Sequence, residues 1–131
     1  MKILLDTNVI ISAILFRGRS RTLLAKLLES NHELYVSEYI DSEFKAKLMQ
    51  KWPSKSEQAY QLFHQLNIHF VNSTSELNGE LRDKKDIPVL SDARFHHIDV
   101  ILTGDKDFLE SDLDTPVILS PSMMMDYFDL N

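Results

Sequence analysis

The stretch Lys2-Ile3-Leu4-Leu5-Asp6-Thr7-Asn8-Val9-Ile10-Ile11 decides the fold class, because a short apolar run ends in it at a polar triplet. Residues 3–5 predict a buried strand, and residues 9–16 predict the first helix. Four more short strands are predicted at 34–36, 68–70, 100–102 and 117–119. Short strands that alternate with helices predict an α/β fold whose central parallel sheet is covered on both faces.

The helical segments between these strands carry recognisable start signals. Ser20 is a predicted N-cap, and leucines 23, 24, 27 and 28 behind it form one apolar stripe. Ser37 is expected to cap the helix that follows the second strand. Further helices are predicted at 56–66, from 86 onward and from 121 onward.

The composition is that of one globular domain, and we expect residues 1–131 to form a single unit. The absence of cysteine excludes disulfides, thiolate metal sites and cysteine nucleophiles. No segment resembles a signal peptide or an apolar span of about 20 residues, so we expect a cytoplasmic protein without a membrane partner. The net charge of −6 argues against a broad basic face for nucleic acid, although Arg17, Arg19 and Arg21 offer local cations.

Four acidic side chains form the candidate site, and two of them follow predicted strands. Asp6 comes directly after Leu5, and Asp105 repeats this arrangement after Leu102. Ligand sites of parallel sheets lie beyond the carboxyl ends of the strands, so we expect both acids at one edge. Each acid has an ordinary alternative role as the N-cap of the next helix. The complete predicted set is Asp6, Glu43, Asp86 and Asp105.

The other two acids are predicted from helix positions. Glu43 borders the inward-facing stripe that contains Phe44, although it is also placed to pair with Lys47 at the surface. Asp86 stands where a helix is predicted to begin, and its alternative role is again that of an N-cap. Less well placed candidates are Asp83, Asp92 and Asp107.

Clustered carboxylates indicate a cation. At about 5 Å and an effective dielectric constant near 20, each like-charged pair costs roughly 3 kcal/mol, so protons or a metal must neutralise the group. Oxygen ligands without thiols or histidine favour Mg²⁺ or Mn²⁺. Such an ion can activate water and stabilise the oxygens of a phosphodiester during its hydrolysis. The residues alone therefore predict an acidic metal site on an α/β fold.

Four segments give the chain a resemblance to a known family. The stretch Leu4-Leu5-Asp6-Thr7-Asn8-Val9-Ile10-Ile11-Ser12-Ala13 closely resembles the opening motif of PIN domains. Residues 37–43, 83–93 and 103–109 resemble the second, third and fourth acidic segments of that family, in the same order. The resemblance covers about residues 2–119 and is strongest to bacterial PIN proteins that are toxins of toxin–antitoxin pairs (VapC-like).

This resemblance implies a three-layer α/β/α fold and Mg²⁺- or Mn²⁺-dependent cleavage of single-stranded RNA. Relatives of this kind commonly form homodimers and are silenced by a small antitoxin protein that covers the site. By the same resemblance Asp6, Asp86 and Asp105 would hold the metal, Glu43 would complete the site, and Asn8 and Thr103 would support it.

One departure and several rival functions remain. Many relatives carry a second acid or Asn where this chain has Ile87, which leaves Asp83 as an alternative third acid. A haloacid-dehalogenase enzyme needs Asp-x-Asp after its first strand, and here Asn8 takes the second place. A response-regulator receiver needs a pair of acids near its first strand, and the single Asp6 fits this poorly. A zinc site at His96-His97 would need a third ligand, which the sequence does not offer. The main alternative is a PIN-fold module that binds RNA or a protein without cutting, and such binding would be indifferent to metal.

Overall fold

Five strands and seven helices alternate along the described parts of the computed structural model, residues 1–76 and 86–127. The strands are β1 (Lys2–Leu5), β2 (Glu33–Ser37), β3 (His69–Val71), β4 (Val100–Leu102) and β5 (Val117–Leu119). The helices are α1 (Thr7–Leu15), α2 (Arg19–Glu29), α3 (Glu38–Lys51), α4 (Ser56–His64), α5 (Ile87–Phe95), α6 (Lys106–Leu109) and α7 (Pro121–Tyr127). Within those two ranges, every helix is too short or too polar to span a membrane.

All five strands are parallel and form one sheet in the order β3-β2-β1-β4-β5. The chain adds β2 and β3 on one side of β1, and then β4 and β5 on the other side. The order in which strands are added therefore reverses between β1 and β4. Leu5 and Leu102, which end these two strands, lie opposite each other in the register. In open parallel sheets, the carboxyl edge at such a reversal is where ligand sites form.

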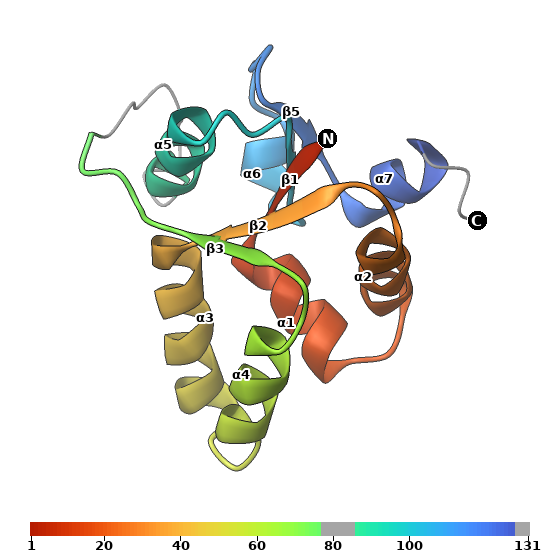
Figure 1. The fold of residues 1–131 in the computed structure, drawn as a ribbon, viewed down its shortest axis with the longest axis vertical. Helices are drawn as coiled ribbons and strands as arrows, with labels where there is room; N and C mark the ends of the chain where they lie inside the picture. Colours follow the sequence, from red (N-terminus) through yellow and green to blue (C-terminus); the bar gives the residue numbers. More distant parts are fainter. Residues whose placement is uncertain (77–85, 128–131) are drawn as a thin grey trace.

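Helices cover both faces of the sheet and give a three-layer α/β/α fold, as predicted (Figure 1). In Figure 1, α1, α3 and α4 lie together on one side of the ribbon formed by β2 and β3, and α5 lies on the other. Helices α2 and α7 pack against each other although they are far apart in the sequence.

The neighbouring strands β1 and β4 are buried on both faces. Residues 3–5 of β1 and 100–102 of β4 are each at most 3% exposed. This agrees with the uninterrupted apolar sequences of these strands, because a parallel sheet covered on both faces has no side for polar residues to alternate on. The carboxyl ends of β1 and β4 are therefore held in a rigid core, and the residues that follow them are positioned by it.

The start of α2 differs from the prediction. The helix begins at Arg19, its N-cap is Gly18, and Ser20 lies inside the first turn. Gly18 has φ 151° and ψ −162°, a conformation that glycine adopts far more readily than serine does. Arg21 donates to the carbonyl oxygens of Ala13 and Ile14 at 2.9 and 2.8 Å, so its guanidinium is used to bind the end of α1.

Candidate functional site

Asp6 lies between the end of β1 and the start of α1, and both of its carboxylate oxygens are hydrogen-bonded. Oδ1 accepts from the backbone N–H of Thr7 at 2.8 Å, which makes Asp6 the N-cap of α1. Oδ2 accepts from the Thr103 hydroxyl at 2.7 Å, across the reversal between β1 and β4. The side chain is buried, with 6% of the residue exposed.

This environment raises the pKa of Asp6 above its ordinary value of 3.8. Burial is the largest cause, because it disfavours the charged form. The hydrogen bonds from Thr103 and Thr7 act in the opposite direction, and the nearby charges of Glu43 and Asp105 raise the pKa further. The carboxylate is thus held in a place where its negative charge is poorly compensated.

The segment after β4 is joined to Asp6 through Thr103. The Thr103 hydroxyl donates to Asp6 and accepts from the backbone N–H of Asp105 at 3.0 Å. Asn8 reaches the same segment, since its Oδ1 accepts from the backbone N–H of Gly104 at 3.1 Å. Asp105 in turn caps the short helix α6 by accepting from the N–H of Asp107 at 2.9 Å. These bonds set the position of Asp105 relative to Asp6.

Glu43 is presented by α3, whose start is capped by Ser37 as predicted. The hydroxyl of Thr7, at the start of α1, donates to Glu43 Oε1. Glu43 and Lys47 share one face of α3, but among the described residues they make no ion pair within 4.0 Å. Glu43 is therefore directed toward the neighbourhood of Asp6.

Asp86 stands immediately before α5 and is 5% exposed. Its backbone carbonyl accepts from Leu90 at 2.9 Å, as expected at the start of a helix. Its side chain makes no capping hydrogen bond to α5. Asp86 therefore occupies the N-cap position of α5, but its carboxylate does not cap the helix.

All four predicted acids line a single cavity of about 70 Å³ at the carboxyl edge of the sheet. They come from four separate places in the chain: the ends of β1 and β4, the middle of α3 and the start of α5. The remaining lining residues are Thr7, Asn8, Lys47 and Val89. Lys47 was interpreted from the sequence only as a surface partner of Glu43, and its place in the cavity is a structural finding.

The donor chemistry of this cavity suits a hard divalent cation, although the side chains are not closed around one. Among the described residues, no three acidic or histidine side chains converge closely enough to hold an ion. Asp6 and Glu43 are instead hydrogen-bonded to the hydroxyls of Thr103 and Thr7. The four carboxylates nevertheless supply only oxygen donors, which Mg²⁺ and Mn²⁺ prefer. The raised pKa of Asp6 is a further sign that positive charge would be accepted there.

The second-tier candidates are not brought to this cavity. Asp107 is exposed and does not line it. Asp92 is buried, but it accepts hydrogen bonds from the Ser73 hydroxyl and the Thr74 N–H, both at 2.7 Å. These bonds attach the segment after β3 to α5. Asp83 lies outside the described residues.

Comparison with solved structures finds the same fold in several proteins. VapBC2 from Rickettsia felis, bound to a DNA fragment from its promoter, has a TM-score of 0.73 and 17% identity, covering 92% of this chain and 98% of that chain. FitAB bound to an IR36 DNA fragment has a TM-score of 0.67 and 20% identity, covering 91% and 94%. VapC20 of Mycobacterium tuberculosis, a Sarcin-Ricin loop cleaving toxin, has a TM-score of 0.59 and 14% identity, covering 81% and 92%.

At these identities the similarity establishes the fold. No curated protein matches the sequence significantly. The sequence model of the PIN domain family matches residues 2–107, a range that contains all four acids of the cavity. The chain therefore belongs to the PIN domain family.

Proposed function

We propose that the chain is a metal-dependent endoribonuclease that hydrolyses phosphodiester bonds in single-stranded RNA. The observation that carries the proposal is the cavity at the reversal between β1 and β4, which four carboxylates line. Burial of Asp6 beside Glu43 and Asp105 costs free energy, and a divalent cation would offset that cost. Membership of the PIN family supports this reading of the cavity.

Each side chain has a role in the proposal. Asp6, Asp86 and Asp105 would hold Mg²⁺ or Mn²⁺, and Glu43 would complete the site directly or through a water molecule. Bound there, the ion would activate water and stabilise the oxygens of the phosphodiester. Thr103 and Asn8 would support the site from this chain, because their hydrogen bonds fix the segment that carries Asp105.

The partners of this activity are also proposed. The solved relatives VapBC2 and FitAB were found bound to DNA, and VapC20 is a Sarcin-Ricin loop cleaving toxin. Together with the resemblance of the sequence motifs, this similarity supports the proposal that the chain is the toxin of a toxin–antitoxin pair, acts in the cytoplasm, forms a homodimer and is silenced by a small antitoxin protein. Copurification from cells that express the chain with the proteins encoded beside it would test this part.

The decisive experiment measures cleavage of a panel of single-stranded, structured and transfer RNAs. The wild type is compared with Asp6→Asn, each with Mn²⁺, Mg²⁺ or EDTA. Asparagine has the shape of aspartate without its charge, so the variant should keep the fold. It should lose cleavage by at least about 100-fold, because the loss of even a group that only supports a metal ligand costs up to about 100-fold. Circular dichroism and a melting curve confirm that the variant is folded.

Two outcomes would contradict the proposal. Cleavage by Asp6→Asn at the wild-type rate would exclude Asp6 from the chemistry. RNA binding that is unaffected by metal, without cleavage by the wild type, would support a non-catalytic PIN module instead. That alternative is favoured by one observation: within the described residues no three acids are close enough together to hold an ion.

A further inference from the structure

We infer that Lys47 binds a phosphate of the RNA backbone next to the bond that is cut. This inference rests on the proposed function, since it takes RNA as the substrate of the cavity. Lys47 stands one helical turn after Glu43 on α3, on the same face of the helix. It is partly buried and lines the cavity together with Glu43 and the three aspartates.

Lys47 is the one cationic side chain among the described residues that line this cavity. Four carboxylates and one ammonium give the lining a formal charge of −3 before any metal is bound. RNA is a polyanion, so a fixed positive group at this position would offset its repulsion from the carboxylates. An ammonium group carries three hydrogen-bond donors and is a common phosphate ligand in proteins.

The ammonium of Lys47 forms no ion pair with another residue in the described structure. Among residues 1–76 and 86–127 it makes no ion pair within 4.0 Å, even though several carboxylates share the cavity with it. Thr7, rather than Lys47, occupies the Glu43 oxygen as a hydrogen-bond donor. Lys47 is therefore available to a ligand that enters the cavity.

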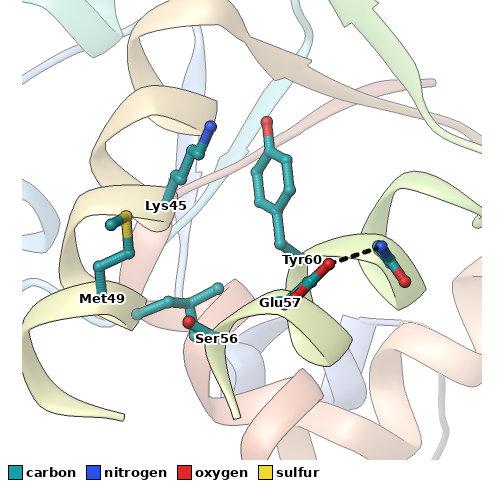
Figure 2. A pocket seen from close by; sticks show the side chains of 7 residues that line it. Lys45, Met49, Ser56, Glu57 and Tyr60 are labelled. Atoms are coloured by element: carbon teal, nitrogen blue, oxygen red, sulfur yellow. Dashed lines mark hydrogen bonds between the residues drawn. The ribbon is translucent and has the colours of Figure 1, made fainter. Parts of the chain in front are cut away.

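Lys45 offers a matched control on the same helix. Two residues apart on a helix, the side chains of Lys45 and Lys47 point to different flanks of α3. Figure 2 shows Lys45 beside Tyr60 in a separate pocket of about 300 Å³ between α3 and α4. Its ammonium lies 5.3 Å from the centre of the Tyr60 ring. Removal of either lysine changes the net charge equally, but only Lys47 lies at the acidic cavity.

The competing explanation is that Lys47 serves as a counter-ion that stabilises the four carboxylates before metal binds. In that case its removal would lower the melting temperature of the metal-free protein and change metal affinity, while RNA affinity at saturating metal stayed the same. A phosphate ligand behaves in the opposite way. Its removal weakens RNA binding and reduces the number of salt ions that are released on binding.

The test measures binding of a short single-stranded RNA to Asp6→Asn protein, which should leave the RNA uncut, over a range of salt concentrations. Lys47→Met should raise Kd about tenfold at low salt, as expected for one lost hydrogen bond to a charged group. It should also reduce the magnitude of the slope of log K against log salt by about 0.7, the value for one phosphate contact on a single strand. Lys45→Met should change neither quantity by a comparable amount, and Lys47→Arg should restore most of the affinity.

Cleavage is then measured separately with Asp6 intact. Lys47→Met should raise KM or lower kcat/KM by about tenfold with Mn²⁺ or Mg²⁺ saturating, and the melting curve shows whether the variant is folded. The inference would be overturned if Lys47→Met changed neither Kd nor the salt slope in the Asp6→Asn protein and left kcat/KM equal to that of the wild type, and the nuclease proposal would then still stand. Absence of cleavage by the wild type would contradict the nuclease proposal, and the binding measurements would still decide whether Lys47 contacts phosphate.

Discussion

Asp6 shows that one side chain can both cap a helix and line the acidic cavity. One oxygen accepts from Thr7 and caps α1, and the other accepts from Thr103 at the end of β4. The carboxylate nevertheless lines the cavity. The two interpretations of this residue that the sequence left open are therefore compatible. The same holds for Asp105, which caps α6 and lines the cavity as well.

The raised pKa of Asp6 predicts an unusual dependence of stability on pH. As pH rises above 3.8, the unfolded chain releases the proton of Asp6 while the folded protein still holds it. The free energy of unfolding must therefore fall with rising pH, up to the pKa of the folded state. Asparagine at this position does not titrate. In EDTA, the stability of Asp6→Asn minus that of the wild type should increase as pH rises from about 4 toward 7.

Urea denaturation of both proteins at a series of pH values measures this difference. Asp112→Asn is a suitable control, because Asp112 is exposed, lies outside the cavity and belongs to none of its hydrogen bonds. A stability difference for Asp6→Asn that stays constant across the pH range would contradict a raised pKa. A part of the stability difference that does not depend on pH is expected in any case, because asparagine changes the hydrogen bond with Thr103. The test therefore depends only on how the difference changes with pH.

Residue contacts were the part of the site that sequence patterns predicted least well. The spacing of Glu43 and Lys47 establishes only that they share one face of α3, not that they pair. The pairing of Glu43 with Thr7 joins residues 36 positions apart and depends on the packing of α1 beside α3. Arg21 was likewise considered as a contact for RNA, and it is bound to carbonyl groups of α1 instead.

At the scale of elements, the strands were predicted more closely than the helix starts. Residues 100–102 and 117–119 form strands with the predicted bounds, because a short run of β-branched and apolar residues is distinctive. The third strand is His69–Val71, one residue later than predicted. The start of α2 was misplaced because the helix begins after Gly18, in a conformation that glycine favours, and without a side-chain cap. Pattern alone identifies strands but leaves their ends to local geometry.

The contact between α3 and α4 gives a prediction at the same scale. Tyr60 of α4 donates its hydroxyl to Asp41 Oδ2 of α3 at 2.7 Å, and burial together with this carboxylate raises the pKa of Tyr60 to about 12. An unfolded tyrosine ionises at about 10. Between these two values the unfolded chain loses the proton first, so the contribution of Tyr60 to stability must decline as pH rises.

Tyr60→Phe should therefore be less stable than the wild type at pH 8, by about 1 kcal/mol for one lost hydrogen bond. That deficit should shrink as pH rises from about 10 to 12, which urea denaturation at alkaline pH can follow. Ultraviolet titration of the wild type should show late phenol ionisation that Tyr60→Phe reduces, and Asp41→Asn should bring the ionisation of Tyr60 partly back toward 10. A deficit that persists at high pH would show that Tyr60 ionises normally.

At the scale of the molecule, the order of the strands creates the site. Sequence motifs placed acids after β1 and β4, and the rule for parallel sheets placed them at one edge. They did not reveal that β1 and β4 are neighbours, since strand pairing joins segments almost 100 residues apart. The reversal between these strands brings Asp6 and Asp105 together, and α3 and α5 contribute the other two acids from either side.

This concentration of like charge predicts that divalent metal stabilises the whole protein. A ligand that binds only the folded state adds about 1.4 kcal/mol at ten times its Kd, which in a domain of this size raises Tm by about 5 °C. Mg²⁺ or Mn²⁺ should produce such a rise in the wild type, measured against NaCl of equal ionic strength to remove the effect of screening. Asp6→Asn and Asp105→Asn should lose most of the response, because each removes an oxygen ligand with its charge. A rise in Tm in both variants equal to that of the wild type would place the bound metal elsewhere. A wild-type Tm that is unchanged at millimolar metal would contradict the proposed metal site, and the four carboxylates that line the cavity would then need another explanation than a cation.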